Sequence, residues 1–190
     1  MRSRSHIFGG QRVYLMEEDT MSIRHTAIDS PLGPLTLSAS GEHLTGLYFG
    51  RHDRRPTVAA LGEYVAPDSD ALLRRAASQV GDYLTGQRKD FDLPLLLAGK
   101  PRQRRIWELL SNIDYGQTTT YGELAAQLAD GTIACEVGQT CGRNPLSIII
   151  PCHRVIGKNG ALTGYAGGLD RKRFLLELEE PACCPAGRLF

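Results

Sequence analysis

The stretch at residues 147–155 constrains this chain more than any other, because three isoleucines in a row end at a proline and a cysteine follows at once. A short β-branched run favours a buried strand over a helix. Pro151 has no N–H to give to a sheet and should end that strand. We therefore expect Cys152 at the end of a strand, with His153 directly beside it.

Cys152 and His153 form a candidate pair of nucleophile and base. A thiol attacks as thiolate, which requires a neighbouring base or a positive field. Free cysteine is also a common apolar filler of protein cores, so the pair alone leaves both interpretations open. Adjacent residues on an extended strand point to opposite faces. His153 can therefore serve Cys152 only if the chain turns there or if a water molecule links the two side chains.

The cysteines argue against a disulfide framework and against a zinc site. Their number is odd, and they stand at positions 135, 141, 152, 183 and 184. Neither a Cys-x-x-Cys nor a His-x-x-x-His pair occurs, and these are the usual spacings of zinc ligands, so we expect no metal. Unpaired thiols are typical of a reducing compartment, and we expect a cytoplasmic protein.

The charge balance limits how this chain could bind nucleic acid. The net charge of the 190 residues is only +1, so a basic binding surface would have to be local. Two basic clusters could supply one, although taken alone each is better explained as a solvated helix face. They are Arg102, Arg104 and Arg105, and Arg171, Lys172 and Arg173.

The pattern along the chain divides it into four parts. Residues 1–20 lack the apolar core of a signal peptide and are expected to form a loose extension. Residues 21–98 predict an N-terminal α/β domain, residues 99–180 a mostly helical domain that carries the active site, and residues 181–190 a tail. No apolar run is long enough to span a bilayer, so we expect no membrane partner. The fold class is α/β, of the α+β kind.

The N-terminal domain should contain a small antiparallel sheet and one helix. Asp70 can cap that helix, and Gly86 suits its C-terminal end. An extended connection to the second domain follows at residues 88–101. Alternating apolar runs predict three strands, at residues 23–28, 35–38 and 44–49.

The C-terminal domain should begin with an amphipathic helix at residues 105–113. Thr120 and Glu123 have the spacing of a capping box and predict the start of the next helix. After a tight glycine turn, Thr132 can cap a further helix that reaches Gly142. A helix, a tight turn and a second helix make a helix-turn-helix.

The second helix of this pair carries a strip with almost no side chain. Ile133 and Val137 are expected to face the core, while Ala134 and Gly138 lie four residues apart on another face. Such a strip lets another backbone come close. It could equally serve close helix packing inside the protein.

Three motifs follow one another in the second half of the chain: Val137-Gly138-Gln139-Thr140-Cys141-Gly142-Arg143-Asn144-Pro145, Pro151-Cys152-His153-Arg154-Val155, and Gly164-Tyr165-Ala166-Gly167-Gly168-Leu169. Together they resemble the signature of the O6-alkylguanine-DNA alkyltransferases, also called methylated-DNA-protein-cysteine methyltransferases. The resemblance is dense from residue 102 to residue 179 and thin before that.

The resemblance implies a DNA-repair activity that uses each protein molecule once. An alkyl group would pass from O6-alkylguanine in double-stranded DNA, with O4-alkylthymine as a further candidate substrate, to the Cys152 thiolate. The transfer would be direct, stoichiometric and irreversible. It needs no cofactor, because the damaged base is itself the donor. The resemblance also implies a monomer and a winged-helix-like helix-turn-helix that binds the minor groove.

The resemblance also implies a proton relay at Cys152. It would run from Glu179 to His153, then through a water to Cys152, with Asn144 bracing the turn. Glu179 stands at the end of the last predicted helix, which Asp170 can cap. On its own, Glu179 would be read as an exposed helix-end carboxylate.

Further residues would hold the DNA and the flipped base. Tyr121 would crowd the DNA backbone and donate a hydrogen bond to the guanine as it leaves; on its own, it would be read as ordinary aromatic packing. The small-faced helix would lie in the minor groove. The remaining predicted contacts are Ala134, Cys135 and Gly138 on that helix, the carbonyl of Val155, Lys158, and the pair Tyr165 and Ala166.

Cys135 departs from the family pattern, which has at this position an arginine that enters the base stack in place of the flipped base. Cysteine is short and uncharged, and Glu136 beside it would repel phosphates if it faced them. Repair of duplex DNA should be slow, with reaction of a free alkylated base retained. One alternative is therefore a module that binds alkylated DNA with weak or no transfer. A cysteine-histidine hydrolase is a second alternative, disfavoured because no separate oxyanion element is recognisable.

Overall fold

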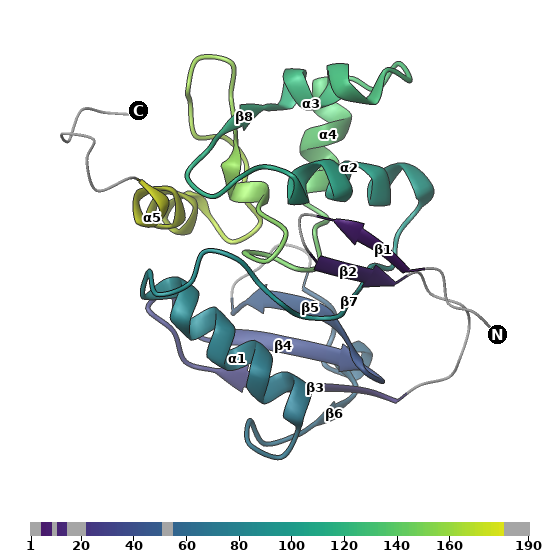
Figure 1. Cartoon of the computed structure of the whole chain (residues 1–190), viewed down its shortest axis with the longest axis vertical. Helices are drawn as coiled ribbons and strands as arrows, with labels where there is room; N and C mark the ends of the chain where they lie inside the picture. Colours follow the sequence, from purple (N-terminus) through teal and green to yellow (C-terminus); the bar gives the residue numbers. More distant parts are fainter. Residues whose placement is uncertain (1–4, 9–10, 15–21, 51–54, 181–190) are drawn as a thin grey trace.

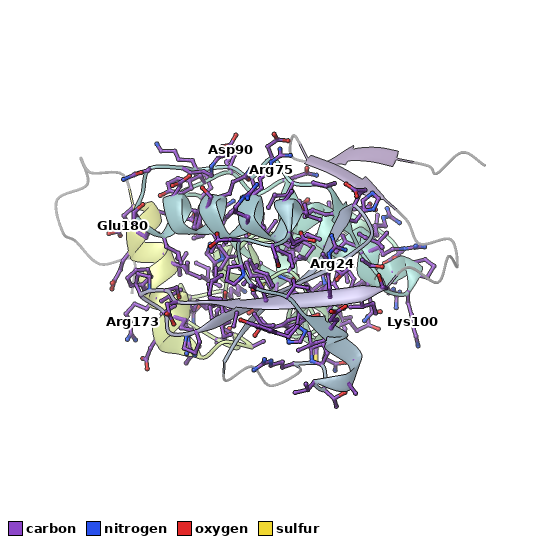
Figure 2. All side chains as sticks on the ribbon, turned by 90° about the horizontal axis from the view of Figure 1, so that it is seen from below. Arg24, Arg75, Asp90, Lys100, Arg173 and Glu180 are labelled. Atoms are coloured by element: carbon purple, nitrogen blue, oxygen red, sulfur yellow. The ribbon has the colours of Figure 1, made fainter. Side chains whose placement is uncertain are left out.

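The computed structural model describes residues 5–8, 11–14, 22–50 and 55–180. A twisted sheet with helix α1 (Ala71–Leu84) on one face forms the lower part of Figure 1, and helices α2, α3 and α4 lie together above it. Figure 2 places Arg173 and Glu180 beside α5 at one end of the molecule, and Lys100, which precedes α2, at the other. None of the described helices is both long and apolar enough to cross a membrane.

The centre of the sheet is the predicted antiparallel meander. It consists of β3 (Ile23–Ile28), β4 (Leu35–Ser40) and β5 (His43–Phe49), with Leu37 opposite Leu47. The predicted helix is confirmed as α1, and the Asp70 side chain accepts a hydrogen bond of 2.8 Å from the Leu73 N–H. Side chains on one face of α1 are fully buried against the sheet: Leu73, Ala76, Val80 and Tyr83.

Four further short strands enlarge the sheet beyond the predicted three. β6 (Glu63–Tyr64) pairs parallel with β3, and β7 (Leu95–Leu96), inside the predicted extended connection, pairs parallel with β5. The hairpin of β1 (Ser5–Phe8) and β2 (Gln11–Tyr14) joins β7. The expectation of a loose extension at residues 1–20 was therefore wrong for these two segments, because strands so short depend on distant partners that local sequence does not reveal. The predicted tail at residues 181–190 lies outside the described residues.

The C-terminal part contains four helices and one short strand pair within the described residues. The helices are α2 (Pro101–Ser111), α3 (Tyr121–Leu128), α4 (Ala134–Cys141) and α5 (Leu169–Glu179). In addition, the N-terminal part contains a short 3₁₀ helix, η1 (Ala59–Leu61). The pair is β8 (Thr119–Thr120) with β9 (Val155–Ile156), and it is parallel. The capping box is confirmed: Glu123 N–H donates to Thr120 Oγ1, and Thr120 N–H donates to the Glu123 carboxylate. The first helix begins earlier than predicted, because Pro101 occupies its first turn.

The starts of α4 and α5 differ from the predictions. Thr132 does not cap α4; its N–H and hydroxyl donate to the Asp130 carboxylate, and Ile133 takes the capping position. Ile133 is 60% exposed and does not face the core, whereas Val137 is fully buried as expected. Gly168 precedes α5, so Asp170 lies in the first turn of that helix and does not cap it.

The isoleucine run forms a buried turn, and the strand predicted there was wrong. The Asn144 side chain causes this, because its amide donates to the Ile150 carbonyl at 2.8 Å and its oxygen accepts from the Leu146 N–H at 3.0 Å. Ile148 adopts a positive φ of 71° within the turn. Cys152 then begins a short 3₁₀ helix, η2 (Cys152–Arg154), and is not at a strand end.

Candidate active site

Cys152 lies on η2 in a buried position beside Asn144. Its side chain is 3% exposed, and the Asn144 amide donates to Sγ at 3.2 Å. Burial raises the pKa of the Cys152 thiol, while the Asn144 hydrogen bond and the charge of Lys172 act in the opposite direction. The resting site therefore holds a thiol, and the thiol needs a base to become a nucleophile.

His153 is oriented by a carboxylate and keeps one nitrogen free. Its Nε2 lies 2.7 Å from Glu179 Oε1, and the ring is completely buried. Burial lowers the pKa of His153, although Glu179 acts against this shift. A neutral ring must place its proton on Nε2, because a carboxylate only accepts. The buried Nδ1 has no partner among the described residues and is available to accept a proton.

Glu179 is the centre of a buried polar cluster. It accepts hydrogen bonds from Arg154 Nε at 2.8 Å, from Arg154 Nη2 at 3.1 Å and from the Gly116 N–H at 3.0 Å, and the Tyr83 hydroxyl also donates to it. Burial alone would raise the pKa of Glu179, but the hydrogen bonds and charges of His153 and Arg154 outweigh burial and lower it to about 2. Glu179 is thus ionised at neutral pH, and it is not an exposed helix-end residue.

The sequence did not identify two members of this cluster. Arg154 was named only as part of the motif around Cys152, and its position next to His153 was the signal that could have identified it as a member of the cluster. Tyr83 is one of the apolar positions of α1, and nothing in the local sequence distinguishes it from a packing residue.

The basic cluster on α5 is only in part the solvated face that the sequence allowed: Arg173 is exposed, whereas Arg171 and Lys172 bind within the protein. Lys172 is fully buried, and its ammonium donates to the carbonyls of Val155 at 2.6 Å and Thr163 at 2.8 Å. Burial lowers the pKa of Lys172 to about 8. Arg171 donates to the carbonyls of Leu32 and Gly167 and so ties the loop before α5 to the N-terminal sheet region. These contacts fix the loop that carries Tyr165.

A pocket of about 810 Å³ collects most of the residues expected to bind the base and the DNA. The Tyr121 hydroxyl lies at its rim and donates to the Thr163 carbonyl at 3.1 Å. Lys158 is exposed and is not among the lining residues, and neither is Val155. The expected residues that line the pocket are Tyr121, Ala134, Cys135, Gly138, Tyr165 and Ala166.

The small-residue strip of α4 faces this pocket and not the protein interior. Ala134 is exposed, and a Cβ added at Gly138 would lie 3.7 Å from the Tyr121 ring, an ordinary contact. Internal packing therefore does not require glycine at position 138. This outcome favours the first of the two interpretations of the strip, which is close approach by an external backbone.

The comparisons with known proteins agree with the motifs. Family models described as the DNA binding domain and the ribonuclease-like domain of 6-O-methylguanine DNA methyltransferase match residues 101–181 and 23–97. A Mycobacterium bovis methylated-DNA-protein-cysteine methyltransferase is 44% identical over 83% of this chain and 93% of its own length. The chain belongs to the O6-alkylguanine-DNA alkyltransferase family. A methylated-DNA-protein-cysteine methyltransferase of Methanosarcina acetivorans is 40% identical over 82% of this chain and 97% of its own length.

Solved structures of the alkyltransferase family share the fold. The crystal structure of Mycobacterium tuberculosis OGT in complex with DNA has a TM-score of 0.74 and 42% identity, covering 82% of this chain and 92% of that chain. An O6-methylguanine-DNA methyltransferase from Pyrococcus kodakaraensis has a TM-score of 0.54 at 21% identity and covers 83% of this chain and 98% of that chain. The predicted combination of an N-terminal sheet with helices is confirmed.

Cys135 occupies an exposed position on the pocket side of α4. The Gln139 side-chain amide donates to its Sγ at 3.7 Å. Glu136, expected to repel phosphates, pairs with Arg102 at 3.2 Å, so part of its charge is neutralised within the protein. Among the described residues, no group of three or more His, Cys, Asp or Glu side chains is arranged to hold a metal ion.

Proposed function

We propose that this alkyltransferase repairs DNA by moving an alkyl group from O6-alkylguanine to the sulfur of Cys152. The observation that carries the proposal is the arrangement at His153, whose Nε2 is held by the ionised Glu179 while its buried Nδ1 is unpartnered, directly beside the Cys152 residue. This arrangement suits a base that removes a proton and is stabilised when it becomes positive.

The reaction begins with transfer of the thiol proton from Cys152 to His153 Nδ1 through one water. Glu179 stabilises the imidazolium that results. The thiolate sulfur then forms a bond to the alkyl carbon while the bond from that carbon to O6 breaks. Guanine keeps the electron pair of the broken bond and takes up one proton, so the net change exchanges the thiol hydrogen for the alkyl group. None of the described residues around Cys152 can cleave the thioether product, so each molecule acts once.

The damaged base must leave the DNA stack, because a buried thiol cannot reach O6 while the base remains inside the duplex. Tyr121 and Tyr165 line the pocket, and the Tyr165 ring also meets the His153 ring edge-on, with centroids 6.5 Å apart. We assign the pocket to the flipped base, with Tyr121 donating a hydrogen bond to the departing guanine.

DNA binding is assigned to the exposed small-residue strip of α4, which fits into a minor groove. Ala134 and Gly138 allow the DNA backbone to come close. The protein would act as a monomer in the cytoplasm and need no cofactor, and O4-alkylthymine is a further candidate substrate. The alternative of a lesion-binding module with weak transfer is less well supported, since Cys152 and the cluster behind it are complete.

The proposal is tested by incubating the protein with duplex DNA that carries O6-methylguanine with an isotopically labelled methyl group. Peptide mass spectrometry then locates the label. Label on the Cys152 peptide is the expected result. Binding of the DNA without label on any peptide would instead support the lesion-binding module. Turnover of an ester substrate without methyl transfer would support a hydrolase.

A further inference from the structure

Tyr83 brings the N-terminal domain into the catalytic cluster. It lies on α1, is completely buried, and its hydroxyl donates to Glu179 Oε1. The same oxygen lies 2.7 Å from His153 Nε2. The Tyr83 oxygen also lies 3.4 Å from that nitrogen. Arg154 Nη2 donates to this oxygen as well, at 3.1 Å, so Tyr83 from the N-terminal half of the chain shares one carboxylate oxygen with His153 and Arg154 from the C-terminal half.

The phenol of Tyr83 is packed between two other aromatic rings. Its ring packs against Phe91 with centroids 5.1 Å apart and against the edge of Tyr115 at 6.0 Å. The rest of α1 packs on the sheet and fixes the backbone from which the ring projects. The shared hydrogen bond is thus built into the core between the two domains.

Two donors on one oxygen weaken each other, because each draws on the same negative charge. A carboxylate that also accepts from a phenol attracts an imidazolium less strongly than one that does not. We propose that Tyr83 is a positioning residue that sets the basicity of His153 through Glu179, so that α1 tunes proton transfer from Cys152. The inference rests on the function proposed above and deepens it.

The other groups around the carboxylate and the imidazole would stay in place if the phenol hydroxyl were removed. Arg154 donates twice to Glu179 from η2, and the Gly116 N–H donates from the loop after α2. Lys172, on α5, points its ammonium at the carbonyls of Val155 and Thr163, and its charge acts on His153 from there.

Tyr115 provides a matched control. Its ring packs against Tyr83, and its hydroxyl donates to the Leu178 carbonyl at 3.0 Å and not to the carboxylate. Tyr115→Phe therefore removes a neighbouring phenol hydroxyl without changing the donors on Glu179.

The test measures the rate at which Cys152 reacts with free O6-benzylguanine as a function of pH. Reaction requires a neutral His153, so the rate falls on the acid side as the imidazole takes up a proton. Tyr83→Phe should raise the basicity of His153 and move this acid limb to higher pH by about half a unit or more. Tyr115→Phe should leave the limb where it is.

A second variant reverses the sign of the effect. Placing 3-fluorotyrosine at position 83 keeps the shape of the side chain and makes its hydroxyl a stronger donor, so the acid limb should move to lower pH. A role of Tyr83 in packing alone predicts a lower rate or a lower melting temperature, with the acid limb unmoved in both variants. That result would overturn the inference.

A measurement without substrate separates this inference from the proposed function. The imidazole nitrogen shifts of His153 can be titrated by NMR in the wild-type protein and in Tyr83→Phe. A higher protonation midpoint in the variant supports the inference even if no alkyl transfer occurs, while an equal midpoint contradicts it. If the wild-type protein reacted with neither O6-benzylguanine nor O6-methylguanine DNA, the proposed function would be contradicted, but the inference about Tyr83 would not.

Discussion

The site has a buried side, which is the cluster around Glu179, and an exposed side, which is the α4 wall of the pocket. On the buried side, Glu179 pairs with Arg154 and holds His153. The exposed side has little side-chain bulk and carries Cys135 where the family pattern has an arginine, and Cys152 itself does not line this pocket. From this difference we expect that the chemistry and the engagement of duplex DNA can be changed independently in this chain.

We expect the largest effect from Glu179→Gln, which removes the carboxylate charge of the buried side. The substitution leaves Arg154 without its buried counter-charge and removes the group that stabilises the imidazolium. Transfer to Cys152 should fall about 10²-fold or more for both free base and duplex DNA. The free energy of unfolding should drop by about 3–5 kcal/mol. Single-turnover kinetics and urea unfolding check the two effects, and a loss confined to duplex DNA would contradict the comparison.

A fall in pH should destabilise the buried side before it affects the pocket side. The pKa of Glu179 is lowered from an ordinary value of 4.5 to about 2, so its ionised form stabilises the fold above about pH 4.5 and this stability is lost as pH falls toward 2. The lowered pKa of His153 acts in the same direction, starting below its ordinary value of 6.5.

Urea unfolding at pH 7, 5 and 3 should therefore show a loss that reaches a few kcal/mol at the lowest pH. Glu179→Gln should flatten this dependence. A wild-type stability that is equal at pH 7 and pH 3 would show that the carboxylate is not held as described.

The exposed side is tested by Cys135→Arg. A long cation on α4 can enter the base stack and attract phosphates, so transfer from duplex O6-methylguanine should become faster by about tenfold, or ~1.4 kcal/mol. The rate with free O6-benzylguanine should stay the same, because α4 acts on the duplex and not on the bond that breaks. Cys135→Ala is the control for loss of the thiol. Equal duplex rates for the wild type and Cys135→Arg would remove the distinction between the two sides.

Lys158→Ala should have the smallest effect. Lys158 is exposed in the turn after β9 and does not line the pocket. Transfer from the free base should change by about twofold or less, as for other surface substitutions. A loss as large as that of Glu179→Gln would place Lys158 at the base after all.

Local signals in the sequence predicted the regular elements well. The Thr120–Glu123 capping box, the Asp70 cap and the meander each depend on residues a few positions apart, and each is present in the structure. The pairing of His153 with Glu179 was implied by the family motifs and is found at 2.7 Å.

Predictions failed where a side chain acts over a distance that local patterns do not cover. The isoleucine run looked like a strand, but the Asn144 amide folds it into a turn. Lys172 looked like a surface charge, but two carbonyls from separate segments allow its burial. Tyr83 lies 96 positions from Glu179, and only the packing of α1 brings them together.

Counting repaired lesions per protein molecule tests the central claim most directly. Increasing amounts of protein are added to a fixed excess of O6-methylguanine DNA, and the lesions that remain are counted when the reaction stops. The account predicts that lesions disappear in proportion to the protein added, one for each Cys152, and that Cys152→Ala removes none. Continued repair beyond one lesion per chain, or repair by Cys152→Ala, would contradict it.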